Sequence, residues 1–515
     1  MQYLLSLIFP ILSFILQVYP RFFNKYFGVD VWTRLLEIEH VRRTDHKIPG
    51  KIKRGFLIEG NFDYPIIFPW IFSFFPKKFL LNIQGLVSPF FDALQNILVF
   101  YIAYSLTGRI EVALLSQAMY AVIPIIPIEN SYLTPRSLGY FNFTLAFFPI
   151  FMYHDSHDPL LLLISLFFAA TLFLTHRFAL QSLLIISVFF SFVDRSFLYL
   201  LNIFAAFSIV MILTKGFYLR VAKGHLYNIY FWIKNYRHRF SHQIYALKKS
   251  KKKVDWVGRV YSLLSLFSPI FMFAMNIWAL SAIIYLLLHT WCGKETTHQV
   301  CGFVNLPPDP IFYRMSLWII FFYAFGAIVL KVKRLIPIGE GQRYMEMSSV
   351  PSVILASTLF FYFYAQYPLI SVLVLGILLL GNLTLILFIQ IKGIITDKNR
   401  SLTSDLQNAY RFINKLKGKP RILCIPHQIT TMTVYNTKAD VLVNADNPGL
   451  MQIQEIYPVL KASIKSLVKK YDLNYLLLRE SYAKLSDLKI PKSKIIYRSG
   501  DVLIADIRRL TSRSS

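Results

Sequence analysis

Charged residues are scarce in this chain, and acidic residues are the scarcest. Only 16% of its 515 residues are charged, 27 Asp and Glu stand against 55 Lys and Arg, and 55% of the residues are hydrophobic. Soluble globular domains carry fewer apolar residues and more charge. Because long, nearly uncharged runs recur through residues 1–391, the composition predicts a multi-spanning α-helical membrane protein.

Several common motifs are also missing. No C-x-x-C pair occurs among the three cysteines, Cys292, Cys301 and Cys424, so a zinc or redox site is not expected. Cys292 and Cys301 share a short loop and would form a disulfide if that loop faced an oxidising compartment. The first apolar run, 2–19, lacks a basic leader and a small-residue cleavage site, so we interpret it as a retained first span.

The apolar runs predict about eleven transmembrane helices. We expect them at residues 2–19, 86–107, 110–128, 138–153, 159–175, 178–193, 195–214, 261–289, 311–330, 350–366 and 368–391. This pattern divides the chain into three regions. They are a first transmembrane module (1–215), a basic interfacial loop with additional transmembrane helices (216–395), and a C-terminal region (396–515).

The C-terminal region predicts a small soluble α/β domain. "SLTSDLQNAYRFINKL" is typical of a capped amphipathic helix, and a second helix is expected near 452–470. Short β-branched or apolar runs predict strands; they lie at 421–425, 440–444, 475–478 and 501–507. Because no Gly-rich phosphate loop, Walker motif or nucleophile elbow is present, we expect this domain to pack against or shape a substrate rather than to carry the chemistry.

The net charge of +28 has two readings in a membrane protein. In the first, basic loops contact anionic lipid head groups. Clustered Arg and Lys also donate charge-assisted hydrogen bonds to phosphate, which favours a phosphate-bearing lipid substrate.

Asp30 follows the first apolar run directly, in "GVDVWTRLLEIEHVRR". If residues 30–43 are helical, Asp30, Arg34 and Glu37 share a face. Asp30 then has either of two roles. It favours the helix dipole and pairs with Arg34, or it serves as a general base at the membrane surface.

Other candidate residues stand at the ends of apolar runs: Asp63 with Tyr64, Glu129 with Arg136, His176 with Arg177, and Arg343. Each has an ordinary structural explanation as a turn former, a span anchor or a loop residue. An acid at such a boundary is also suited to bind a metal or a substrate hydroxyl, and a buried arginine needs an anionic partner. "HDSHD" (154–158) has metal-like spacing, but an ordinary loop explains it better.

In this order, the signals resemble the GT-C superfamily of polyprenyl-phosphate-dependent membrane glycosyltransferases, in its protein mannosyltransferase and aminoarabinose transferase-like branch. Asp30 matches the acid that opens the first loop of that family, and "FDYP" (62–65) matches its aromatic-proline segment. Glu129 takes the place of the second-loop acid, where the family more often has Asp. The resemblance covers about residues 1–215.

The resemblance implies an inverting transfer from a polyprenyl-phosphate-linked donor to a lipid, glycan or protein acceptor on the extracytoplasmic side. Asp30 would be the general base, with Glu129 and Asp63 as further catalytic acids. The residues expected to bind substrate or phosphate are Tyr64, Arg136, His176, Arg177 and Arg343. A divalent cation (Mg or Mn) held by Asp30 and Glu129 is left open. The alternatives are a transporter or flippase of lipid-linked saccharides and a non-catalytic membrane scaffold.

The expected location is a bacterial or archaeal cytoplasmic membrane. Counting spans from a cytoplasmic N-terminus puts the basic loops 20–85 and 215–260 outside, against the positive-inside rule. We keep this orientation because long loops translocate with less regard to charge.

Overall fold

The computed structural model describes residues 2–52, 55–239, 241–244, 268–292, 310–442 and 447–508. The chain folds into two compact units, each assembled from segments that are far apart in the sequence. Unit 1 contains Met1–Phe23, Gly85–Gly216 and Lys253–Ile395, and unit 2 contains Asn24–Gln84, Phe217–Lys252 and Thr396–Ser515. The three-region division predicted from the sequence stays a prediction. Unit 2, however, also takes the first loop, which the prediction had grouped with the first spans.

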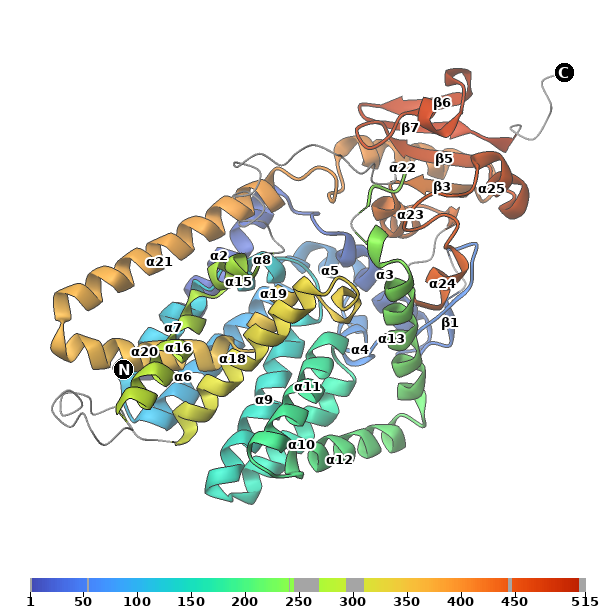
Figure 1. The fold of residues 1–515 in the computed structure, drawn as a ribbon. Helices are drawn as coiled ribbons and strands as arrows, with labels where there is room; N and C mark the ends of the chain where they lie inside the picture. Colours follow the sequence, from blue (N-terminus) through green and yellow to red (C-terminus); the bar gives the residue numbers. More distant parts are fainter. Residues whose placement is uncertain are drawn as a thin grey trace. The chain divides into compact units, whose positions relative to one another are not determined.

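Unit 1 is helical throughout its described residues (Figure 1). Its helices are α1 (Gln2–Leu5), α2 (Ile8–Phe23), α6 (Val87–Thr107), α7 (Ile110–Ala121), α8 (Ile125–Asn130), α9 (Arg136–Ser156), α10 (Pro159–Phe173), α11 (Arg177–Val193), α12 (Leu198–Leu213), α15 (Pro269–Met275), α16 (Leu280–Cys292), α18 (Pro310–Lys331), α19 (Gly341–Glu346), α20 (Ser349–Gln366) and α21 (Pro368–Gln390). Helix α9 packs on α6, α10 and α11, and α20 packs on α7, α16 and α18.

Four helices of the described residues are long and apolar enough to cross a membrane. They are α6, α18, α20 and α21 with its extension to Ile395; a fifth is counted if Leu198–Leu213 and Phe217–Lys234 form one broken span. Five more apolar helices are shorter than a full crossing. The number of about eleven spans therefore stays a prediction.

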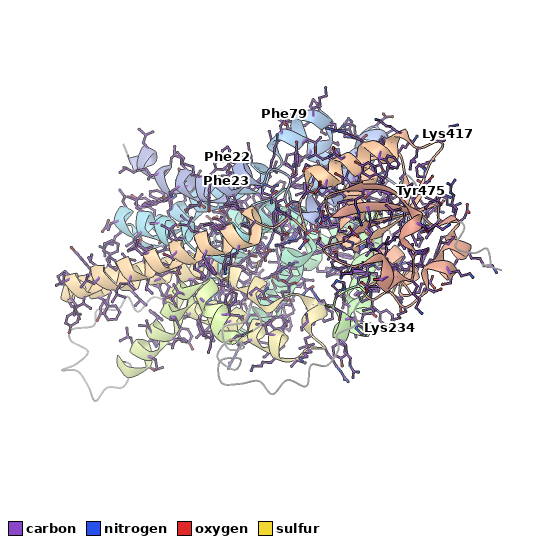
Figure 2. The ribbon with its side chains drawn as sticks, turned by 90° about the horizontal axis from the view of Figure 1, so that it is seen from above. Phe22, Phe23, Phe79, Lys234, Lys417 and Tyr475 are labelled. Atoms are coloured by element: carbon purple, nitrogen blue, oxygen red, sulfur yellow. The ribbon has the colours of Figure 1, made fainter. Side chains whose placement is uncertain are left out.

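The surface of unit 1 is apolar where lipid contact is expected. Helix α21 leaves large apolar side chains exposed along its length, among them Leu369, Val372, Leu373, Ile377, Leu380 and Phe388. At the end of α2, Phe22 and Phe23 point outward (Figure 2) and are 81% and 71% exposed. Apolar surface of this extent is costly in water and favourable in a bilayer.

Unit 2 combines the first loop, the basic loop and the C-terminal region. The first two supply helices α3 (Val29–Arg43), α4 (Ile67–Ser73), α5 (Lys77–Ile83) and α13 (Phe217–Lys234), with the short strands β1 (Lys51–Ile52) and β2 (Gly60–Asn61). The C-terminal region supplies α22 (Ser404–Lys415), α23 (Thr430–Asn436), α24 (Asn447–Gln452) and α25 (Ile464–Tyr471), with strands β3 (Arg421–Ile425), β4 (Asp440–Val441), β5 (Tyr475–Arg479), β6 (Ile495–Ser499) and β7 (Val502–Asp506).

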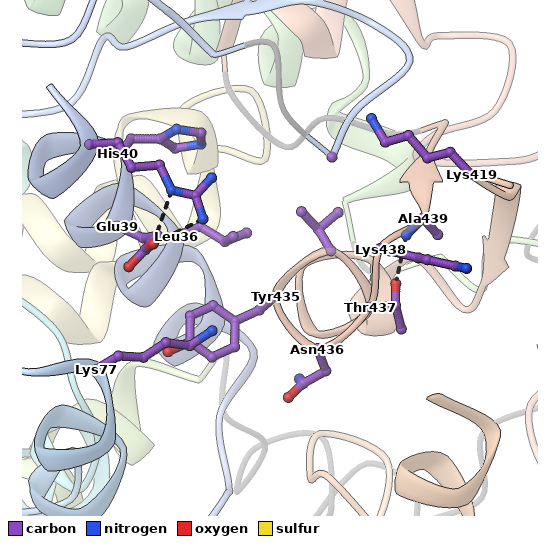
Figure 3. Close-up of a pocket in the computed structure, with 13 residues that line it drawn as sticks. Leu36, Glu39, His40, Lys77, Lys419, Tyr435, Asn436, Thr437, Lys438 and Ala439 are labelled. Carbon is purple, nitrogen blue, oxygen red and sulfur yellow. Dashed lines mark hydrogen bonds and ion pairs between the residues drawn. The ribbon is translucent and has the colours of Figure 1, made fainter. Parts of the chain in front are cut away.

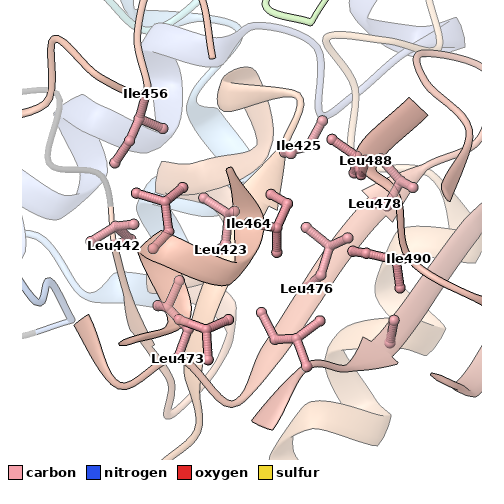
Figure 4. Packing of buried hydrophobic residues seen from close by; sticks show 14 of the residues in the cluster. Leu423, Ile425, Leu442, Ile456, Ile464, Leu473, Leu476, Leu478, Leu488 and Ile490 are labelled. Atoms are coloured by element: carbon pink, nitrogen blue, oxygen red, sulfur yellow. The ribbon is translucent and has the colours of Figure 1, made fainter. Parts of the chain in front are cut away.

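The five C-terminal strands form one mixed sheet in the order β4-β3-β5-β7-β6. Strands β4, β3 and β5 are parallel, and β7 and β6 continue the sheet antiparallel. Every residue of β5 is buried, as expected for a central strand covered on both faces. Leu423, Leu476 and Leu478 lie in the core (Figure 4). Ile58 and Phe231 join the same cluster, so all three segments of unit 2 share one core.

The strands predicted at 421–425, 440–444, 475–478 and 501–507 each correspond to an observed strand, whereas β6 was not predicted. The helix predicted in "SLTSDLQNAYRFINKL" (401–416) is confirmed as α22 at Ser404–Lys415, and Thr403 caps it by accepting a hydrogen bond from the Leu406 N–H. The prediction of one helix across 452–470 is wrong for the residues before Ile464, where α25 begins. Pro458 lies in the missing turns, and proline interrupts a helix interior.

Of the cysteines, Cys424 is free and buried. Burial raises the pKa of its thiol to about 12, so it is not a reactive nucleophile. Cys301 falls outside the described residues, so the predicted disulfide with Cys292 stays a prediction.

Candidate functional site

Asp30 lies in the first turn of α3 and is exposed. The helix begins after Gly28, whose φ of 108° is one that side chains rarely adopt. A carboxylate in the first turn is favoured by the helix dipole. Within the described part of the chain, no hydrogen bond or ion pair engages the Asp30 carboxylate, so both of its oxygens are open to accept a proton.

Arg34 pairs with Glu37 rather than with Asp30, the partner proposed from the sequence. Arg34 Nη1 lies 2.6 Å from Glu37 Oε2, and its guanidinium carbon lies 3.7 Å from the centre of the Tyr64 ring. Glu37 is buried and needs a cation more than the exposed Asp30 does. Burial by itself would lower the pKa of Arg34. Its interactions with Glu37, Tyr64 and Asp30 outweigh burial, so the pKa of Arg34 lies above its usual value. Arg34 therefore carries a permanent positive charge that interacts with both Asp30 and Tyr64.

Unlike the exposed Asp30, Asp63 is buried. Its side chain is buried against α13, at Gly224. A β-carbon at Gly224 would collide with the Asp63 carboxylate, so only glycine allows this close approach. This packing favours the structural reading of Asp63 over the catalytic one.

Two further residues of unit 2 were not predicted from the sequence. Burial raises the pKa of Tyr457 to about 12, and the Asp30 carboxylate adds to this rise. The Tyr457 ring contacts the His427 ring at 4.4 Å between centroids. His427 stands just past the carboxyl end of β3, an edge where parallel sheets commonly place functional side chains. In the sequence, His427 could have been identified as a polar residue directly after the apolar run "RILCIP".

In unit 1, Arg136 is the centre of a buried ion-pair cluster. Its Nη2 lies 2.7 Å from Glu346 Oε2, its Nε donates to the Tyr140 hydroxyl at 2.8 Å, and its Nη1 donates to Glu129. Glu346 was not predicted. Because all three guanidinium nitrogens already have protein partners, Arg136 is better suited to hold α8, α9 and α19 together than to bind phosphate.

Arg343 is more accessible than Arg136. Its side chain is 35% exposed and its Nε lies 3.3 Å from Glu340. It interacts electrostatically with Glu129 and Arg136, so it belongs to the same end of unit 1. Among the predicted arginines of this cluster, Arg343 is the one with room to receive an anion.

His176 also lies at this end of unit 1. Its side chain caps α11 by accepting from the Ala179 N–H, and its ring meets the Tyr140 ring at 6.0 Å between centroids. The cap explains the position without a ligand, and Arg177 begins the helix. The structure thus brings together Glu129, Arg136, His176 and Arg343.

Asp92 of α6 is a buried acid that the sequence reading missed, although an acid within an apolar span is a functional signal. It accepts hydrogen bonds from Gln17 at 2.5 Å, Ser13 at 3.2 Å and Tyr120 at 2.9 Å. Asn130 of α8, next to Glu129, donates to it at 3.5 Å. Asp92 therefore ties α2, α6, α7 and α8 together and positions the segment that carries Glu129.

The "HDSHD" segment is accounted for by ordinary structure. Asp155 lies 2.7 Å from Arg314, which pairs at the same distance with Asp194, and Asp158 caps α10. Within the described residues, no group of three His, Cys, Asp or Glu side chains could hold a metal ion. Glu129 is engaged by Arg136 and is a poor metal ligand in this arrangement. The predicted cation stays a prediction, and no step below depends on it.

The helical architecture of unit 1 and the mixed sheet of unit 2 recur together in solved structures. No protein-family model and no curated protein match the chain. The crystal structure of the Archaeoglobus fulgidus oligosaccharyltransferase in complex with Zn and sulfate matches with a TM-score of 0.56 and 11% identity, covering 95% of this chain and 71% of that one.

Archaeal oligosaccharyltransferase AglB from the same organism, in complex with an inhibitory peptide and a dolichol-phosphate, matches with a TM-score of 0.52 and 11% identity over 93% and 69% of the two chains. ArnT from Cupriavidus metallidurans, bound to undecaprenyl phosphate, aligns over 96% of this chain and 97% of that one at 11% identity with a TM-score of 0.43. The likeness to the oligosaccharyltransferase confirms the GT-C fold that the sequence predicted.

Proposed function

We propose that this chain is a multi-pass membrane glycosyltransferase that moves a sugar from a polyprenyl-phosphate-linked donor to a glycan, lipid or protein acceptor on the extracytoplasmic side. One observation carries the proposal: in a chain with the oligosaccharyltransferase fold, Asp30 presents a carboxylate at the start of the first loop that has no hydrogen bond or ion pair with any described residue. The dolichol-phosphate in the AglB complex supports a lipid-linked donor.

The chemistry requires one base and one site for the leaving phosphate. Asp30 removes the proton of the acceptor hydroxyl while the acceptor oxygen forms a bond to the anomeric carbon of the sugar. The bond from that carbon to the phosphate oxygen breaks, and polyprenyl phosphate leaves with the electron pair. The transition state is oxocarbenium-like, as in glycoside hydrolysis.

Within unit 1, Arg343 is our choice for a residue that binds a lipid phosphate. A guanidinium stabilises charge that develops on phosphate oxygens, and the Arg343 side chain is partly exposed. Arg34, stacked on Tyr64, holds its positive charge beside Asp30.

The test uses cells that lack the gene. Mass spectrometry would compare their lipid-linked sugars and envelope glycans after complementation with wild type, Asp30→Asn or Asp45→Asn. Asn keeps the shape of Asp and removes the proton acceptor, so we expect Asp30→Asn to lower transfer by about 10²–10⁴-fold, the usual size of a general-base contribution.

Asp45→Asn is the matched control, because Asp45 is an exposed acid of the same loop. It should restore the glycans fully at equal protein abundance. Full restoration by Asp30→Asn would contradict the assigned base and favour the transporter or scaffold alternatives.

A further inference from the structure

Unit 2 has basic side chains in two settings. The first is a basic cavity of about 440 Å³ between α3 and residues 434–439 (Figure 3). The ammonium groups of Lys77 and Lys438 lie on opposite sides of α23 there, and the Leu416 carbonyl already accepts from Lys438 at 2.6 Å. These cations do not converge on one ligand. The second setting is α13, where basic and apolar side chains share one exposed face.

Helix α13 is buried in unit 2 along one face. On that face, Phe231 is fully buried and belongs to the core around the C-terminal sheet. Gly224 receives the side chain of Asp63, and Arg220 Nη1 donates to the Pro49 carbonyl at 3.1 Å. These contacts hold α13 to both the first loop and the C-terminal region, so the direction of its opposite face is set.

The opposite face carries an apolar stripe, formed by Leu219, Leu226, Tyr230 and Ile233. These side chains are between 46% and 64% exposed. Their spacings of seven, four and three residues place them in one row along an α-helix, about 21 Å from the first to the last. A row of large apolar side chains is unfavourable in water. The stripe therefore needs an apolar partner.

Cations line one edge of this stripe. Lys223 and Lys234 follow Leu219 and Tyr230 by four residues each, so they lie on the same side of the helix. Both lysines are exposed, and neither has a carboxylate partner among the described residues. The chain itself contains no Asp or Glu from 195 to 254. The partner of the stripe is therefore expected to carry negative charge beside its apolar surface.

The place of α13 in the chain points to lipid as that partner. The predicted span 195–214 ends directly before α13 begins at Phe217, so the helix starts at the expected membrane boundary. Tyrosine is enriched at this boundary, and cations spread from Arg220 to Lys234 are costly within the hydrocarbon region. The charges therefore favour a helix that lies along the surface over one that crosses the bilayer.

We propose that the apolar stripe of α13 docks unit 2 on the surface of a bilayer that contains anionic lipids. The stripe enters the boundary between head groups and acyl chains, and Lys223 and Lys234 contact lipid phosphates. Because α13 contacts both other segments of unit 2, this docking holds the whole unit at the membrane surface. The proposal concerns lipid contact only, so it can fail while the transfer by Asp30 stands, and the reverse also holds.

Fluorescence quenching in nanodiscs tests the docking. Leu226→Cys and Tyr230→Cys are made singly in a cysteine-free full-length protein and labelled with a polarity-sensitive dye. The matched control is Ile496→Cys, because Ile496 is also a large apolar residue of unit 2, 41% exposed, on β6. Lipids that carry a nitroxide near the head group should quench both α13 labels about twofold or more strongly than the control label.

The charge contact is tested with Lys223→Gln/Lys234→Gln. With both lysines present, phosphatidylglycerol should increase the quenching of Leu226→Cys over that in phosphatidylcholine alone, and salt should reduce the increase. The lysine variant should lose this increase. Lys465→Gln/Lys469→Gln removes the same charge from exposed positions on α25 and should keep it.

Quenching of the α13 labels no stronger than that of the control would overturn the docking. Stronger quenching by a nitroxide deep in the acyl chains would place α13 across the bilayer and contradict the surface position. An increase with phosphatidylglycerol that survives the lysine variant would contradict the head-group contact. Labels that are shielded without lipid quenching, in a preparation that is dimeric by light scattering, would assign the stripe to a second copy of the chain instead.

Discussion

His427 shows how burial changes the chemistry of a single side chain. Its backbone N–H donates to the Gln243 side chain at 2.9 Å, and its ring packs on Tyr457. Within the described residues its Nδ1 has no hydrogen-bond partner. Burial lowers the pKa of its imidazole from the usual 6.5 to about 4, so the ring is neutral at physiological pH.

This shift predicts a pH dependence of stability. Between pH 4 and 6.5 the unfolded chain binds a proton at His427 and the folded chain does not. The stability that the neutral ring contributes is therefore complete above about pH 6.5 and is lost as the pH falls toward about 4. Thermal unfolding in detergent should show wild type losing more stability over this range than His427→Asn. His157→Asn, at an exposed histidine, should behave as wild type, and parallel loss in wild type and His427→Asn would contradict the prediction.

Arg343 carries the second prediction at this scale. A hydrogen bond to a charged group contributes about 1.5–3 kcal/mol, so Arg343→Gln should weaken binding of polyprenyl phosphate by about tenfold or more. The binding would be measured in detergent with the purified protein. Arg334→Gln removes an exposed charge from the preceding loop and should bind normally. If both variants bind as wild type does, Arg343 is not the phosphate site.

At the scale of elements, α9 is held by a charge cluster at each end. Arg136 joins Glu129 and Glu346 at its start, and Asp155 pairs with Arg314 at its close. A helix of 21 residues is about 30 Å long, close to the thickness of a bilayer core. The two clusters therefore hold both ends of α9 to the neighbouring helices of unit 1.

Removing the Arg136 guanidinium should destabilise the fold strongly. Arg136→Ala leaves Glu346 buried without its cation, and a broken buried pair costs about 3–5 kcal/mol. The matched control, Arg109→Ala, breaks a pair with Glu111 whose side chains are 51% and 50% exposed, so it should cost at most about 1 kcal/mol. The two midpoints of thermal unfolding would be compared in one detergent. Similar shifts would argue against a structural role for the Arg136 cluster.

At the scale of the whole molecule, the three chain segments that make up unit 2 restrict the membrane topology. The segments 24–84, 217–252 and 396–515 form one compact unit, so all three must lie on the same side of the membrane. The predicted spans between them are consistent with this arrangement, since an even number of crossings separates each pair.

Cysteine labelling checks that topology. In a cysteine-free background, Asp45→Cys and Lys417→Cys, both at exposed positions, should react alike with a membrane-impermeant maleimide in intact cells. His157→Cys, in the loop after α9, should react in the opposite way. Under the orientation we favour, the first two are labelled and the third is protected. Different labelling of Asp45→Cys and Lys417→Cys would contradict a shared side.

Asp30 was predicted correctly as a first-turn acid because its position depends on local features, the end of an apolar run and the start of a helix. The pairing with Arg34, one of the two roles considered for Asp30, is taken by Glu37, which lies on the same helix and is buried while Asp30 is exposed. The competition between two carboxylates for one guanidinium depends on burial. Burial is a property of the folded chain.

Glu346 and Asp92 show the same limit for long-range contacts. Glu346 pairs with Arg136, 210 positions away, and the donors to Asp92 come from three other helices. No local pattern specifies such partners.

The sequence by itself determined the membrane-protein class, the GT-C resemblance, the capped helix at 404–415 and most strands of the C-terminal sheet. Each of these follows from hydropathy, periodicity and capping over short distances. Only the tertiary structure decided that the first loop, the basic loop and the C-terminal region share one core, which buried carboxylates pair with which arginines, and where a basic cavity forms. The physical reason is that burial of apolar surface joins segments regardless of their order in the chain.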